Sequence, residues 1–119
     1  MDFFVRQFPE ALLEARQTLA QFLGAQLENL VLVENATQAM NVVANSFPLA
    51  AGDQVLLTDH EYGALIRGWK ACTKRIGAHF IQREISLPCT THEEFTEYFW
   101  KSVTNKTKVI FISQITSST

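Results

Sequence analysis

The stretch LVLVENATQAMNVVANSF, residues 30–47, combines two patterns of apolar residues. Its first four residues form a dense apolar run, which predicts a short buried strand at Leu30–Val33. The run breaks at Glu34 and Asn35, and apolar residues then recur with helical spacing from Ala36 to about Phe47. A helix that follows a strand so closely has backbone N–H groups in its first turn without an intrahelical acceptor. The stretch therefore raises the question of what binds at the start of this helix.

The rest of the chain alternates between helical and strand patterns. A helix is predicted from Pro9–Glu10, a favourable start, to Gly24, a typical stop. Further helices are expected around Leu65–Ile76 and around Phe95–Phe99, the second with Thr91 as its N-cap. Strands are expected at Gln54–Thr58, His79–Arg83 and Lys108–Ser113. This order predicts an α/β fold in which helices cover both faces of a mainly parallel sheet.

Composition excludes several classes of protein. The chain has 119 residues, of which 47% are hydrophobic, and a formal net charge of −2. No linker divides it, so a single unit is expected. Without a basic block there is no electrostatic case for binding nucleic acid or an anionic membrane, and the apolar runs are too short to span a bilayer. The start lacks the pattern of a secretory signal, so the expected compartment is the cytoplasm.

Two further groups of residues carry little functional signal. Cys72 and Cys89 are too few for a disulfide framework. Asp59, His60 and Glu61 are consecutive, and consecutive side chains of an extended segment point to alternate sides. We therefore expect no metal site at this position.

Several motifs, in order and with suitable spacing, resemble one enzyme family. They are ENATQAMNVV from residue 34, GDQVLLTDHEYGAL from residue 52, and VIFISQITSST from residue 109. Together they resemble the aminotransferase class V family of pyridoxal-phosphate (PLP) enzymes, in particular its isopenicillin-N-epimerase-like and cysteine-desulfurase-related branch. The resemblance implies that residues 1–119 are an incomplete cofactor-binding (large) domain of fold type I, truncated at both ends. It also implies PLP as cofactor, an amino-acid substrate and a homodimer for the complete enzyme.

The resemblance assigns five cofactor-binding residues. Ala36 and Thr37 match the residues that bind the cofactor phosphate, and a helix start favours an anion for physical reasons as well. Tyr62 matches the aromatic residue that stacks on the pyridine ring, although cysteine desulfurases usually have histidine there. Ser117 stands where many relatives have asparagine near the ring hydroxyl, and Gln114 is expected at the edge of the site. The alternatives are that Asn35 simply caps the helix and that Tyr62 is an ordinary half-buried loop residue.

The resemblance also shows which residues the chain lacks. The family's chemistry requires a Schiff-base lysine and an aspartate that pairs with the pyridine nitrogen, and none of the five lysines matches. We therefore assign no catalytic residue and expect the chain alone to be inactive. Two other functions stay open: a stand-alone α/β domain that binds a phosphorylated ligand without covalent chemistry, and a structural fragment without a ligand.

Overall fold

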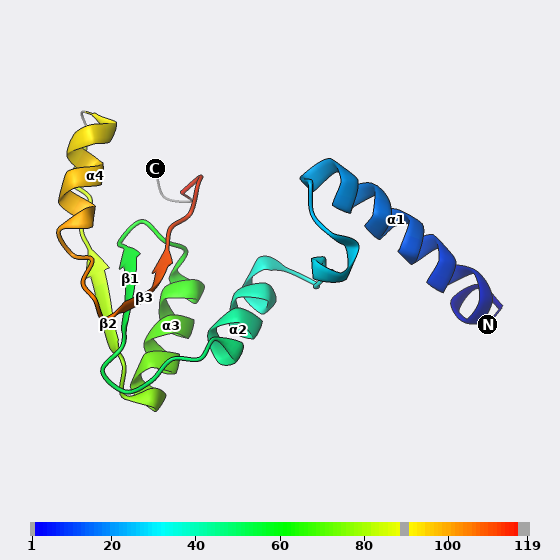
Figure 1. Ribbon diagram of the computed structural model, residues 1–119, viewed down its shortest axis with the longest axis horizontal. Coiled ribbons are helices and arrows are strands. Elements are labelled where there is room, and N and C mark those ends of the chain that lie inside the picture. The colour runs from blue at the N-terminus through cyan, green and yellow to red at the C-terminus, as the bar shows by residue number, and fades with distance from the viewer. Residues whose placement is uncertain (1, 89–90, 117–119) are drawn as a thin grey trace. The chain divides into compact units, whose positions relative to one another are not determined.

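The computed structural model describes residues 2–88 and 91–116, which form two compact units, Met1–Glu34 and Asn35–Thr119 (Figure 1). The two units are joined without a glycine- or proline-rich linker, and for this reason the sequence predicted one undivided unit. The division instead falls between Glu34 and Asn35, inside the stretch that was predicted to run from a strand directly into a helix.

The first unit is built on one long helix. A π-helical turn at Phe3–Gln7 leads into α1, Phe8–Leu23, with a proline in its first turn. The helix ends at Gly24, whose φ of 64° lies in the left-handed region that glycine adopts without steric cost. A 3₁₀ turn at Leu27–Asn29 then folds back on α1, because Nη2 of Arg16 donates hydrogen bonds of 2.9 Å to the carbonyl oxygens of Leu27 and Leu30.

The predicted strand at Leu30–Val33 is wrong. These residues form no strand in the structure, and the side chains of Val31, Leu32 and Val33 are 75%, 49% and 42% exposed. A strand exists only when its backbone pairs with a neighbour, and the described part of the chain offers this segment none. The apolar run therefore predicted buried side chains, whereas these residues are exposed in the structure.

The second unit contains a parallel sheet of three strands in the order β2-β1-β3. The central strand β1, Gln54–Thr58, pairs in parallel with β2, His79–Arg83, and with β3, Thr107–Phe111. All five residues of β1 are buried. The three predicted strands in this unit are confirmed, and the parallel sheet places their carboxyl ends at one edge.

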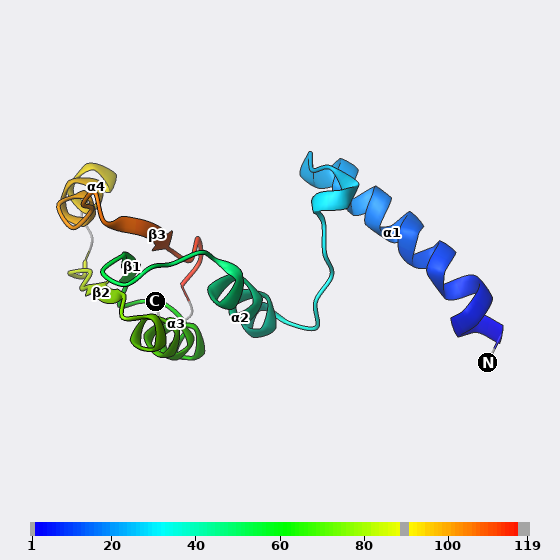
Figure 2. The ribbon, with the colours of Figure 1, turned by 60° about the horizontal axis from the view of Figure 1, so that its bottom comes forward.

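Helices cover the two faces of this sheet (Figure 2). On one face lie α2, Ala36–Ser46, and α3, Gly63–Ile76. Their side chains form the core with Val55 and Leu57 of β1, and Trp69 of α3 is 1% exposed. On the other face lies α4, His92–Trp100, which starts with the predicted cap: the Thr91 hydroxyl accepts the N–H of Glu94 at 3.1 Å. The α/β class predicted from the sequence is confirmed.

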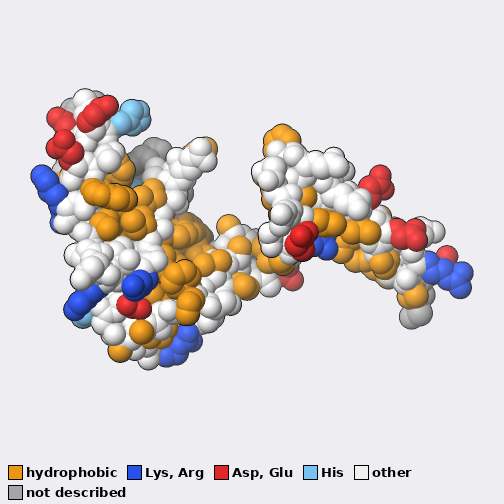
Figure 3. Space-filling model, viewed as in Figure 1, with side chains coloured by type: hydrophobic (Ala, Val, Ile, Leu, Met, Phe, Trp, Pro, Cys, Tyr) orange, Lys and Arg blue, Asp and Glu red, His pale blue; other side chains and the backbone are white. Residues whose placement is uncertain are grey.

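Many apolar side chains lie at the surface of both units (Figure 3). On the second unit they include Ile110 and Ile112, which are 40% and 46% exposed. The outer strands β2 and β3 have no further partner among the described residues. Open edges beside apolar surface favour association between chains. No helix in the described part of the chain has the length and apolar character required to cross a membrane.

We expect the isolated 119-residue chain to self-associate, and Ile110→Glu to raise its monomeric fraction because a charge on an edge strand opposes pairing. Val42→Glu is the matched control, since Val42 of α2 is 55% exposed and the change in net charge is the same. Sedimentation velocity across a concentration series measures the monomeric fraction. An unsubstituted chain that stays monomeric and unfolds cooperatively would contradict this expectation.

Candidate functional site

The first turn of α2 presents two backbone N–H groups that donate to no described residue. Asn35 has an extended backbone, and its Oδ1 accepts the N–H of Gln38 at 2.8 Å. Its carbonyl oxygen accepts the N–H of Ala39 at 3.1 Å. Among the described residues, no hydrogen bond comes from the N–H of Ala36 or Thr37. Asn35 therefore caps the helix, as the alternative to a phosphate site supposed, but the cap leaves two donors at the positive end of the helix available for an anion.

The start of α2 lies at the same end of the unit as the start of α3. The two helices run in parallel, because Sγ of Cys72 donates to the carbonyl of Ala44 at 2.9 Å and Nη2 of Arg75 donates to Oδ1 of Asn45 at 2.7 Å. About two turns earlier on each helix, this register brings Thr37 level with the first turn of α3. Figure 1 shows both helix starts at the end of the unit where β1 terminates.

Tyr62 stands at this end, between β1 and α3. It is the N-cap residue of α3, and its carbonyl oxygen accepts the N–H groups of Leu65 and Ile66 at 2.8 and 3.2 Å. These bonds hold its backbone, whereas its side chain is 55% exposed. A tyrosine ring with so much free surface can stack on a flat ligand.

Two carboxylates after β1 join this strand to both of its neighbours. Oδ1 of Asp59 accepts the N–H of Ile85, beyond β2, at 2.9 Å. Glu61, 5% exposed, accepts the Thr58 hydroxyl at 2.7 Å through Oε1 and the N–H of Ser113, beyond β3, at 3.0 Å through each oxygen. Its Oε2 also accepts the Ser113 hydroxyl.

The role of Glu61 was not predicted from the sequence, which raised its carboxylate only as a possible metal ligand. In the structure this carboxylate connects the ends of β1 and β3. A signal was present, because a carboxylate directly after a buried strand meets the ends of neighbouring strands at the same edge of a parallel sheet.

The other two predicted residues follow β3. Gln114 comes directly after Ser113 and is exposed, so the Glu61–Ser113 contact places it near Tyr62. Ser117 lies outside the described residues, as does Cys89, while Cys72 is a buried free thiol. The structure thus brings Ala36, Thr37, Tyr62 and Gln114 to one end of the second unit.

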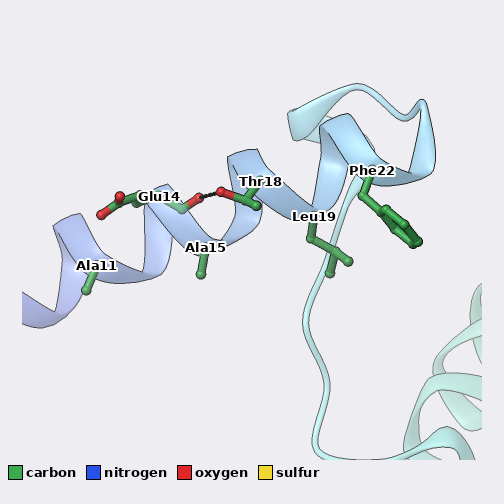
Figure 4. A pocket seen from close by; sticks show the side chains of 6 residues that line it. All are labelled: Ala11, Glu14, Ala15, Thr18, Leu19 and Phe22. Carbon is green, nitrogen blue, oxygen red and sulfur yellow. Dashed lines mark hydrogen bonds between the residues drawn. The ribbon is translucent and has the colours of Figure 1, made fainter.

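Two hollows on the described surface are of similar size, and one of them includes the predicted phosphate position. It has a volume of about 550 Å³ and runs along α2, with Asn35 and Thr37 in its lining. The other, of about 600 Å³, lies on α1 in the first unit, between Ala11 and Phe22 (Figure 4). Each of the two hollows is lined by a single helix, so the hollows alone do not decide between them. We take the start of α2 as the candidate site because its first turn presents two backbone donors at the positive end of the helix.

The lysines lie away from this end of the second unit. Nζ of Lys70 lies 5.2 Å from the ring centroid of Phe80, near the start of β2, and Lys74 is in the last turn of α3. Lys101 and Lys106 precede β3, and Lys108 is its second residue. The Lys106 carbonyl accepts the N–H of Gln54, the first residue of β1. No lysine of this chain is thus placed to react with a ligand held between α2 and Tyr62.

Comparison with known proteins identifies relatives of the whole chain. The chain is 36% identical over 126 aligned residues to an isopenicillin N epimerase from Amycolatopsis lactamdurans, covering all of this chain and 31% of the relative. It is 32% identical to a probable cysteine desulfurase from Vibrio cholerae, covering 88% of this chain and 26% of the relative. A solved structure of C-DES superposes with a TM-score of 0.83 at 19% identity, covering 92% of this chain and 28% of C-DES.

These relatives are about three to four times as long as the chain, which spans 31% and 26% of the two sequences. The similarity to C-DES concerns the fold, and it matches the arrangement of helices and parallel strands described above. The sequence model of the aminotransferase class V family matches residues 3–119. The chain therefore belongs to the aminotransferase class V family.

Proposed function

We propose that this chain is part of the cofactor-binding domain of a larger PLP-dependent enzyme that acts on an amino-acid substrate. Family membership supports a PLP enzyme, and the C-DES structure carries glycine covalently linked to its PLP cofactor. When bound, PLP supplies an electron sink that stabilises negative charge on a substrate carbon. The residues of this chain bind and orient that group.

The observation that carries the proposal is the pair of unused N–H groups at the start of α2. A phosphate there accepts the N–H groups of Ala36 and Thr37 and lies at the positive end of the helix dipole. The Thr37 hydroxyl is half-buried, has no hydrogen-bond partner among the described residues, and is a third donor. Ala36 is exposed and has a small side chain, so an anion can reach the backbone. The residues present thus fit the phosphate of PLP.

The same end of the unit holds the ring of the cofactor. The exposed side chain of Tyr62 covers one face of the pyridine ring and excludes water from it. Gln114, and Ser117 beyond the described residues, offer polar groups to the ring substituents. A tyrosine is a poorer proton shuttle than a histidine at neutral pH, so Tyr62 weakens the case for a desulfurase.

The reacting groups come from outside this chain. Its lysines lie at the opposite end of the second unit, so the catalytic lysine belongs to another segment of the complete enzyme. We further propose that the complete enzyme is a homodimer, as the family resemblance implies.

Within the full-length protein, we expect Thr37→Val to raise the dissociation constant of PLP by roughly ten- to a hundredfold. The substitution keeps the shape and the N–H of Thr37 and removes a charge-assisted hydrogen bond, worth about 1.5–3 kcal/mol. Thr37→Ser, which keeps the hydroxyl, is the control and should bind PLP with nearly unchanged affinity. Fluorescence or absorbance titration of the cofactor-free protein with PLP measures both constants.

If Thr37 only supports the helix start, Thr37→Val will change the thermal stability of the cofactor-free protein by up to about 1 kcal/mol. It will then leave the PLP dissociation constant unchanged, and the assignment of Thr37 to the phosphate fails.

Tyr62→Ala should weaken PLP binding by roughly two- to tenfold, because a stacked aromatic pair contributes about 0.5–1.5 kcal/mol. It should also shift the absorption maximum of the bound cofactor, since one face of its ring becomes hydrated. Tyr62→Phe retains the ring and should preserve both properties. Equal affinities and spectra for the unsubstituted protein and Tyr62→Ala would argue against stacking.

A further inference from the structure

We propose that Glu61 is a positioning residue that holds the Tyr62 ring in place against the cofactor ring. The inference rests on the proposed function, because it acts through the stacking role of Tyr62. It adds a residue that neither the sequence motifs nor the family comparison assign.

The Glu61 carboxylate is almost fully enclosed in neutral hydrogen-bond donors. It is 5% exposed and accepts from the Thr58 hydroxyl, the Ser113 N–H and the Ser113 hydroxyl. Removing a carboxylate from water is unfavourable unless it is paired or fully hydrogen-bonded. Three donors compensate for that cost only while the ends of β1 and β3 keep this geometry, so the carboxylate specifies one arrangement of the two strands.

This constraint acts directly on Tyr62, the next residue in the chain. Thr58 and Ser113 hold the Glu61 side chain from two strands, which leaves the Glu61–Tyr62 peptide little freedom to move. On its other side, the Tyr62 carbonyl is held by the first turn of α3. The Tyr62 side chain itself is 55% exposed and has little protein packed around it. Its direction therefore depends on the backbone, and the Glu61 contacts restrain that backbone on the strand side.

Asp59 provides a matched comparison. It also follows β1 and also has a carboxylate that accepts a backbone N–H, but that N–H belongs to Ile85, beyond β2. Asp59 thus joins β1 to β2, and it lies two residues further from Tyr62 along the chain than Glu61 does. Replacing either carboxylate with an amide is the same chemical change at the same edge of the sheet.

The test is a double-mutant cycle in the full-length protein, with PLP as the probe. Glu61→Gln, Tyr62→Ala and the double variant are compared with the unsubstituted protein, and Asp59→Asn is the control. The measurements are the PLP dissociation constant, the absorption maximum of bound PLP and the melting temperature of the cofactor-free protein. Should Glu61→Gln fail to fold, Ser113→Ala replaces it in the cycle, because it removes one donor and leaves the carboxylate in place.

We expect Glu61→Gln to raise the dissociation constant by roughly two- to fivefold, no more than Tyr62→Ala does, and to shift the absorption maximum in the same direction. In the Tyr62→Ala background the same substitution should have no further effect on binding, because the ring through which Glu61 acts is gone. Asp59→Asn should leave the dissociation constant within twofold.

Two results would overturn the inference in distinguishable ways. If Tyr62→Ala weakens binding but Glu61→Gln has the same effect with and without the tyrosine ring, Glu61 stabilises the fold generally and does not act through Tyr62. If Tyr62→Ala itself leaves the affinity and spectrum unchanged, the stacking part of the proposed function fails, and the role of Glu61 fails with it.

Discussion

The complete burial of β1 is the constraint on which the rest of the second unit depends. Its five residues are all buried, with Val55 and Leu57 in the core under α2 and α3 and with neighbouring strands on both edges. Polar side chains form hydrogen bonds at both ends of β1. At the amino end, the Gln54 amide donates to the Ser102 carbonyl at 2.8 Å and accepts the Thr104 hydroxyl at 3.1 Å. At the carboxyl end, Glu61 connects β1 to β3 and Asp59 connects β1 to β2. Side chains as well as backbone pairing therefore hold the register of β1 with each neighbouring strand.

The candidate site is a consequence of this arrangement at the carboxyl edge of the sheet. A helix start with two unused N–H groups is a common feature and specifies no ligand by itself. Here α2 packs in parallel on α3, so the start of α2 lies at the end of the unit where β1 and β3 terminate. Tyr62 follows β1 at this end, and Gln114 follows β3. Donors for an anion and an exposed aromatic ring then meet at one end of one unit. Ligands gather at this edge of open parallel sheets because successive loops converge there.

Sequence patterns predicted most of the local structure correctly because the signals for it are short-range. The cap at Asn35, the cap at Thr91 and the stop at Gly24 each depend on one residue and its immediate neighbours. The strand predicted at Leu30–Val33 was wrong because hydrophobicity indicates a preference for burial, whereas a strand also needs a hydrogen-bonded partner that the described chain does not supply. For the same reason the role of Glu61 was not predicted, because its hydrogen-bond partner Ser113 is 52 residues away in the sequence.

By itself, the sequence determined the α/β class, the family and which residue types stand at the helix start and after the strands, because periodicity, caps and ordered motifs are properties of the linear chain. Only the tertiary structure decided that the N–H groups of Ala36 and Thr37 donate to none of the described residues. It also decided that Tyr62 is exposed and that a buried carboxylate beside it joins β1 to β3. The physical reason is that exposure and hydrogen-bond satisfaction depend on which distant segments meet. A side chain such as Glu61 acquires its role only when two strands bring its donors within reach.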